Sequence, residues 1–253
     1  MKLDALIFAA HPDDAELGMG GTIAKLTGEG MKVGIIDLTK GEMGTRGNTE
    51  IRQTEAFRAA GLLKLTVREN YHVKDGEISD TKENLMSVII GMRKYKPKFI
   101  FAPYFNDRHP DHIALSLLVK KAYFFSGLAK ILTFEKDSPQ EAFRPEKLFY
   151  YMSTYAFEPK LIVDISDTFE TKMKAVNAYS SQFFDPSSKE PDTFISQPGF
   201  FDYIQARARF YGFRIGKDFG EPFYCEEELP FDIIGAFNDT QKNGNKKDQP
   251  VIL

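Results

Sequence analysis

The chain has 253 residues, of which 42% are hydrophobic and 27% charged, a composition typical of a globular protein that excludes a disordered or fibrous chain. Its 33 basic and 36 acidic residues give a formal net charge of -3, which argues against non-specific binding to nucleic acid or an anionic membrane. Because a single cysteine, Cys225, can form neither an internal disulfide nor a cysteine-rich metal site, any metal ligands must be His, Asp or Glu.

Short apolar runs and longer amphipathic stretches alternate along the first half of the chain. Three apolar runs bounded by turn residues predict buried strands, at 6–10, 33–38 and 99–102. Four stretches predict helices, at 20–26, 48–61, 79–96 and 111–126. Because strands and helices alternate, we expect an α/β fold with a mainly parallel sheet flanked by helices.

The second half predicts strands at 148–152 and 161–165 and helices at 167–180 and 199–213. The proline-containing segment 184–197 between the last two helices is typical of a lid or binding loop. Because no repeat or linker divides the chain, we expect a single domain at 1–237 and a polar, disordered C-terminal tail at 238–253.

The N-terminal apolar run ends at His11 and is too short for a signal peptide. No other stretch approaches the ~20 apolar residues that a membrane-spanning helix needs. We therefore expect a cytoplasmic protein with no membrane and no nucleic-acid partner.

Three of the four histidines fall in two short motifs of similar composition, AHPDDAE at 10–16 and NDRHPDH at 106–112. Each motif follows a predicted buried strand. In an open parallel sheet, ligands bind beyond the carboxyl ends of the strands, where the strand order reverses. If the strands at 6–10 and 99–102 are neighbours there, both motifs face one crevice. A lone His-Pro-Asp is often only a turn, but two such motifs after two strands favour a site.

His11, Asp14 and His112 then form a set of two histidines and one carboxylate, which suits Zn²⁺ and leaves a fourth position for water. Zinc lowers the pKa of bound water to about 7 and polarises a carbonyl oxygen. We expect one ion per subunit, although such ligands also accept Fe, Co or Mn.

Acid and base groups adjoin these predicted ligands. Asp13 is suited to remove the proton of the attacking water. His109 lies about one helical turn before His112, so when protonated it can stabilise an oxyanion and then donate to a leaving amine. Asp111 is the nearest carboxylate that could orient His109 and keep it charged.

The glycine-rich loop 39–47 and two later arginines predict an acidic substrate. Arg52 and Arg108 adjoin the proposed crevice, and arginine binds carboxylates in a two-pronged geometry. Thr45 and Arg46 of the loop are further candidates for substrate contact, although Arg46 on its own is typical of solvated surface charge.

A dinucleotide site is the rival interpretation, suggested by the glycines at 18, 20 and 21 together with Asp37. The required third glycine is Ile23, and His-Pro-Asp-Asp stands where the first glycine should follow the strand. These glycines are better explained by close packing of a helix on the sheet. His72 and Cys225 lack chemical companions and are expected to be surface or packing residues.

The two motifs resemble those of the LmbE-like, or PIG-L, family of zinc-dependent N-acetylglucosaminide deacetylases. More narrowly, the chain is similar to the bacillithiol-biosynthesis branch, through GEMGTRGNTEIRQTEA, APYFNDRHPDH, SQF and ARARFYGFRIG followed by EPF. That branch removes acetate from N-acetylglucosaminyl malate. The similarity covers nearly the whole chain up to Phe237.

The resemblance implies a Rossmann-like fold and a homo-oligomer, often a hexamer in this branch. It implies a zinc site with an adjacent base and an oriented acid, at the residues named above, and it associates Arg52 and Arg108 with the malate end of the substrate. The broad family has HPDDE where this chain has Ala15 and then Glu16, so the resemblance gives Glu16 no role. A tyrosine oxyanion donor could be Tyr104 or Tyr203.

Three functions follow from the sequence. The first is hydrolysis of N-acetylglucosaminyl L-malate to glucosaminyl malate and acetate. The second keeps the site but takes another N-acetylglucosamine conjugate, such as a chitooligosaccharide or a mycothiol-type inositol conjugate. The third is a non-catalytic sugar- or metal-binding protein, against which Asp13 and His109 argue because binding alone needs no proton transfer.

Overall fold

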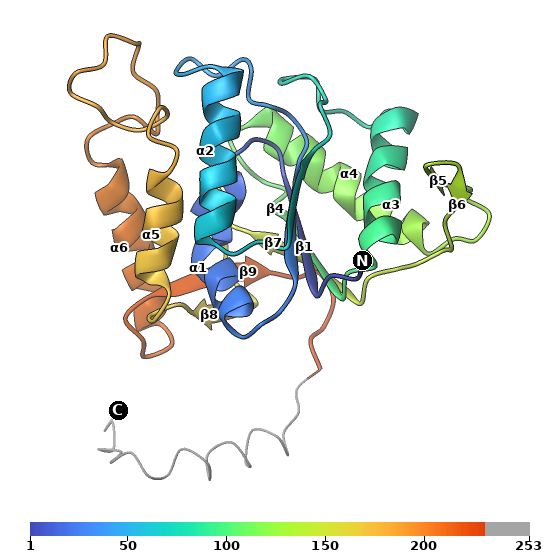
Figure 1. The fold of residues 1–253 in the computed structure, drawn as a ribbon. Helices are drawn as coiled ribbons and strands as arrows, with labels where there is room; N and C mark the ends of the chain where they lie inside the picture. Colours follow the sequence, from blue (N-terminus) through green and yellow to red (C-terminus); the bar gives the residue numbers. More distant parts are fainter. Residues whose placement is uncertain (231–253) are drawn as a thin grey trace.

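The computed structural model describes residues 1–230, in which strands and helices alternate along the chain (Figure 1). Seven strands form one sheet in the order β3-β2-β1-β4-β7-β9-β8. Their bounds are β1 Ala5–Ala9, β2 Val33–Asp37, β3 Val67–Asn70, β4 Phe99–Pro103, β7 Lys147–Tyr151, β8 Leu161–Asp164 and β9 Gly220–Tyr224. A separate hairpin comprises β5 Phe134–Glu135 and β6 Ser138–Pro139.

Helices cover both faces of the large sheet (Figure 1). Their bounds are α1 Asp14–Gly28, α2 Thr49–Leu62, α3 Lys82–Tyr95, α4 Pro110–Ser126, α5 Phe169–Asn177 and α6 Phe200–Phe213. Apolar side chains of α3 and α4 pack on one face, and those of α1 and α5 pack on the other. Across residues 1–230, no helix is both long and apolar enough to cross a membrane.

The predicted α/β class and mainly parallel sheet are confirmed. Strands β1, β2, β3, β4 and β7 pair in parallel, whereas β9 runs antiparallel to β7 and β8. The predicted boundary at 237 and the predicted tail at 238–253 lie outside the described residues.

Two predicted helix starts were wrong, and three pieces of strand were missed. Helix α1 begins at Asp14 rather than Gly20, and α3 begins at Lys82 behind a Thr81 cap. Strand β3 is half-buried and has the sequence VREN, so it gives no apolar run. Strand β9 contains a proline, a residue typical of strand edges and turns, and the hairpin strands have only two residues each.

The glycines of α1 allow this helix to lie close to the elements around it, as the sequence predicted. A Cβ added at Gly21 would lie 2.7 Å from Cδ1 of the buried Ile165, and one at Gly18 would meet the ring of the buried Tyr151. Contacts this short force neighbouring side chains to move. Because of these glycines, α1, which begins within the first histidine motif, packs closely against the sheet.

We expect Gly21→Ala to lower the free energy of unfolding by about 1–3 kcal/mol, because the added methyl group overpacks the contact with Ile165. Gly28→Ala is the matched control on the same helix, since a Cβ there meets nothing within 4 Å. It should be neutral or stabilise the protein by up to about 1 kcal/mol, the difference in helix propensity between the residues. Urea unfolding of both variants measures this, and equal stabilities would contradict the packing argument.

Candidate active site

Strands β1 and β4 bring the two histidine motifs to the same edge of the sheet. The strands pair in parallel, with Ala5 opposite Phe99 and Ile7 opposite Phe101. The strand order reverses here, because β2 and β3 extend the sheet on one side of β1 while β4 lies on the other. The ring centroids of His11 and His112 are 5.6 Å apart. The prediction that the motifs share one crevice is therefore confirmed.

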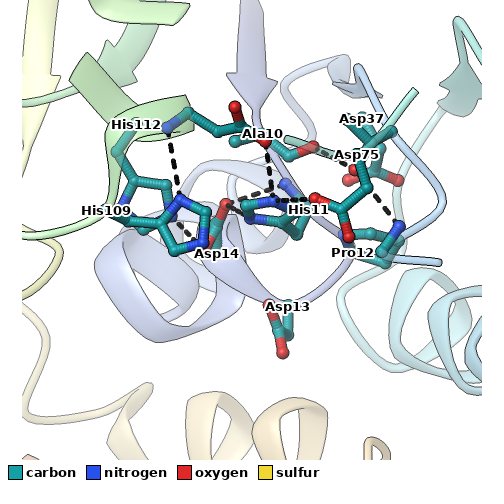
Figure 2. Close-up of polar contacts among 12 residues, drawn as sticks. Ala10, His11, Pro12, Asp13, Asp14, Asp37, Asp75, His109 and His112 are labelled. Carbon is teal, nitrogen blue, oxygen red and sulfur yellow. Dashed lines mark hydrogen bonds and ion pairs between the residues drawn. The ribbon is translucent and has the colours of Figure 1, made fainter. Parts of the chain in front are cut away.

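Asp14 lies between the imidazoles of the two motifs (Figure 2). Its Oδ2 is 3.4 Å from His11 Nδ1 and accepts the His11 main-chain N–H at 2.8 Å, and its Oδ1 is 3.1 Å from His112 Nε2. All three residues are buried. Two imidazole nitrogens and the two oxygens of one carboxylate that lie this close together form a donor set suited to a divalent cation such as Zn²⁺. Within residues 1–230, the sets of three ligand atoms that all lie within 4.8 Å of one another are His11, His109 and His112, and His11, Asp75 and Asp111.

The electrostatics of these residues also favour a positive charge between them. Burial alone would lower the pKa of His112, but the carboxylates of Asp14 and Asp107 outweigh it and raise this pKa to about 9. Burial would raise the pKa of Asp14, yet the charges and hydrogen bonds of His112 and His11 lower it well below its usual value. A bound cation would supply the charge that this environment favours.

Asp107 is a site residue that the sequence analysis missed, although it belongs to the second motif. Its Oδ1 is 3.0 Å from His112 Nδ1, and its Oδ2 accepts the Thr154 N–H at 2.7 Å. Oδ1 also accepts the main-chain N–H of His109. Asp107 therefore fixes the His112 ring with Nε2 turned toward Asp14. Its position two residues before His109 is typical of an ordinary turn residue, so no separate signal in the sequence could have identified it.

Asp75 was missed as well, and Asp111 lies differently from the prediction. Asp75 follows β3, and its Oδ1 is 2.9 Å from His11 Nε2. The Asp111 carboxylate was expected to orient His109; instead its Oδ2 accepts the Gly76 N–H at 2.8 Å and lies 3.4 Å from His11 Nε2. The reason is that the start of α4 faces the loop after β3, where this main-chain donor is available.

His109 is the N-cap of α4, and the Asp111 main-chain N–H donates to its Nδ1 at 3.2 Å. Its ring stacks on that of His112 with centroids 4.9 Å apart. Burial and the neighbouring imidazoles of His11 and His112 lower the pKa of His109, which differs from the expectation that a carboxylate keeps it charged. Because Nδ1 accepts a hydrogen bond, a neutral His109 carries its proton on Nε2.

Asp13 points away from Asp14 (Figure 2). Its backbone φ of 118° is a strained value for a residue with a side chain, and such strain clusters at functional sites. Burial raises the pKa of this carboxyl to about 7, although the positive charge of Arg52, whose Nη2 is 3.4 Å away, opposes the rise. The unusual backbone conformation of Asp13 thus lets two carboxylates that are adjacent in the sequence point in different directions.

A cavity of ≈ 540 Å³ opens over these groups. Its lining includes the predicted residues His11, Asp13, Asp14, Thr45, Arg52, Arg108, His109 and His112. Residues 193–195 of the predicted loop also line it, and the Arg108 guanidinium lies 4.8 Å from the centroid of the Phe194 ring. Tyr203 is in the lining, whereas Tyr104 packs among aromatic side chains outside it.

The predicted substrate arginines differ in what they contact. Arg52 donates to the carbonyls of Gly41 and Pro12, at 3.1 and 2.7 Å, so its guanidinium holds the two loops of the site together. Arg46 is buried outside the cavity lining, with Nε 3.8 Å from Glu190 Oε2, and is thus not the solvated charge that its sequence suggested. Arg108 is exposed at the cavity.

Glu16, to which the sequence analysis assigned no role, lies outside the cavity lining in a buried polar cluster. It accepts from Arg68 Nη1 at 2.5 Å and from the Tyr179 hydroxyl at 3.0 Å. Arg68 in turn donates twice to Asp37, at 2.7 and 2.9 Å. Through these hydrogen bonds the cluster links α1 to β2 and β3, next to the strand ends that carry the site.

Residues 6–123 match the model of the PIG-L family, described as GlcNAc-PI de-N-acetylase. The chain is 32% identical over 190 residues to diacetylchitobiose deacetylase of Thermococcus kodakarensis, covering 70% of this chain and 69% of that protein. It is 28% identical over 196 residues to probable N-acetyl-alpha-D-glucosaminyl L-malate deacetylase 2 of Bacillus cereus, covering 72% and 84%. The solved structure of the conserved protein TT1542 from Thermus thermophilus superposes with a TM-score of 0.81 and 37% identity, covering 91% and 98%.

Proposed function

Because this chain belongs to the PIG-L family, we propose that it hydrolyses the N-acetyl group of an N-acetylglucosamine conjugate and releases acetate and a free amine. The observation that carries this proposal is the convergence of Asp13, Asp14, His11 and His112 in one cavity. Within that class, the substrate that we propose is N-acetylglucosaminyl L-malate, which would place the reaction in bacillithiol biosynthesis. We also propose that the protein is a homo-oligomer and acts in the cytoplasm.

Under this proposal His11, Asp14 and His112 would hold one Zn²⁺ ion. When bound, the cation would polarise the acetamide carbonyl and make water acidic enough to be deprotonated near neutral pH. Asp13 takes the proton of the attacking water, a role that suits a carboxyl whose pKa is about 7. His109, whose Nδ1 accepts the Asp111 N–H, offers its Nε2–H as a hydrogen bond to the oxyanion. Asp13 then passes the proton that it took from water to the departing amine.

Arg108 supports an acidic substrate. Its exposed guanidinium faces the cavity beside Phe194, and within residues 1–230 no carboxylate lies within ion-pair distance of it. Arginine in that position matches a substrate carboxylate such as that of malate. Diacetylchitobiose is the second candidate, favoured by the identity to the archaeal enzyme, and it carries no charge to match Arg108.

The test incubates the metal-loaded protein with N-acetylglucosaminyl malate, diacetylchitobiose and N-acetylglucosamine in parallel and measures amine release. We expect the highest kcat/KM for the malate conjugate. Arg108→Ala should raise KM for that conjugate roughly 10-fold, the loss of one hydrogen bond to a charged group, and leave the uncharged sugars unaffected. Arg58→Ala is the control, because Arg58 is an exposed arginine of α2 outside the cavity.

Three results would contradict parts of this proposal. Equal losses on all substrates in Arg108→Ala would remove the argument for an acidic substrate. A higher kcat/KM for diacetylchitobiose would favour the second candidate. Absence of amine release from any substrate, with zinc or other divalent metals supplied, would favour a non-catalytic sugar- or metal-binding protein.

A further inference from the structure

We propose that Asp75 is a positioning residue: together with Asp111 it accepts the Nε2–H of His11 and so directs the Nδ1 lone pair of His11 toward Asp14 and His112. The inference rests on the proposed role of His11 as a metal ligand. It concerns a residue far from both motifs in the sequence, in the loop between β3 and α3.

The two nitrogens of His11 face different groups. Nδ1 lies on the side of Asp14, 3.4 Å from Oδ2, whereas Nε2 lies 2.9 Å from Asp75 Oδ1 and 3.4 Å from Asp111 Oδ2. Figure 2 shows the His11 ring between Asp14 and Asp75. An ionised carboxylate only accepts hydrogen bonds, so the proton of a neutral imidazole here belongs on Nε2. The lone pair is then on Nδ1, the nitrogen nearer to Asp14.

Main-chain donors hold both carboxylates in place. Asp75 Oδ2 accepts the Met43 N–H at 2.9 Å, and Asp111 Oδ2 accepts the Gly76 N–H at 2.8 Å. The main-chain N–H of Asp75 itself donates to Glu42 Oε1 at 2.9 Å. Both aspartates are buried. Because these bonds come from the loops after β2 and β3, the carboxylates are fixed independently of His11 and can determine how its ring is oriented.

Two other roles for Asp75 fit these contacts less well. Asp75 lines the cavity, so it could bind a substrate hydroxyl, but each of its oxygens already has a partner, His11 for Oδ1 and Met43 for Oδ2. His11, Asp75 and Asp111 could also hold a cation of their own. The 2.9 Å separation of Nε2 and Oδ1 is instead that of an ordinary N–H···O hydrogen bond. Carboxylate partners of this kind orient ligand histidines in metalloproteins.

The test measures zinc affinity by competition with a chromophoric chelator for wild type, Asp75→Ala, Asp75→Asn and Glu77→Gln. We expect Asp75→Ala to bind zinc about 10- to 100-fold more weakly, the usual effect of removing an outer partner of a ligand histidine. Asp75→Asn should lose less, because an amide oxygen of the same reach can still accept from Nε2–H. Glu77→Gln, at an exposed position in the same loop, should match wild type.

A second measurement separates orientation from stability. In ¹⁵N-histidine NMR of the zinc-loaded protein, His11 should show a slowly exchanging Nε2–H signal that is lost in Asp75→Ala, while far-UV circular dichroism and Tm establish that the variant is folded. Wild-type zinc affinity in Asp75→Ala with a raised KM would overturn the inference in favour of substrate contact. A second zinc equivalent that only wild type binds would overturn it in favour of a separate cation site.

Failure of this inference is distinguishable from failure of the proposed function. If wild type binds zinc and releases amine while Asp75→Ala binds zinc equally well, only the positioning role is wrong. If wild type binds no zinc, or binds zinc without releasing amine from any conjugate, the proposed function itself is contradicted.

Discussion

Asp13→Asn is expected to lower kcat by about 10²- to 10⁴-fold, the usual contribution of a general base, while the protein keeps its metal. Asparagine has the same shape as aspartate but cannot take a proton from water. The structure separates the two functions, because Asp13 points away from Asp14 and the two histidines that would bind the metal (Figure 2). The loss should therefore appear in turnover and not in metal content.

Steady-state kinetics together with elemental analysis of zinc check this expectation. Asp13 also lies 3.4 Å from the buried Arg52, so Tm should be compared to show that the variant remains folded. Asp75→Asn is a useful comparison, because it removes another buried carboxylate from the same cavity. Its main effect should be on zinc affinity, whereas that of Asp13→Asn should be on kcat. An Asp13→Asn protein with zinc and wild-type kcat would reject the proposed base.

His112→Ala should lose zinc affinity by more than the roughly 10- to 100-fold that removal of an outer partner causes, because it removes a ligand itself. The Nε2 atom of His112 is 3.1 Å from Asp14, and without the imidazole the Asp14 carboxylate would keep only His11 as a neighbouring ligand. We expect the same result for His11→Ala. Amine release should fall in parallel with metal content in both variants.

Thermal unfolding with and without zinc measures this loss independently of activity. A ligand present at 100 times its Kd stabilises the folded state by about 2.7 kcal/mol, so zinc should raise the Tm of wild type but not that of His112→Ala. His72→Asn is the matched control, because His72 is the remaining histidine and is exposed. Equal zinc-dependent shifts in wild type and His112→Ala would show that the ion binds elsewhere.

Much of the fold could be predicted from the sequence, because buried parallel strands are continuous apolar runs. Strands β1, β2 and β4 have this pattern. Strand β3 could not be found in this way. It lies at the edge of the sheet, is half-buried and has a mostly polar sequence, so its pairing with β2 defines it more than its composition does.

The sequence by itself determined which residue types the site contains and that both motifs stand at strand ends, since a strand end is a local property. The sequence could not show that Asp75 lies beside His11, or that Arg52 donates a hydrogen bond to the Pro12 carbonyl. These contacts join residues that are far apart in the chain. Nor could it show that Asp111 faces His11 rather than the imidazole of His109. Only the tertiary structure decided these orientations, because the partner of a buried polar group depends on which loops the packed sheet brings together.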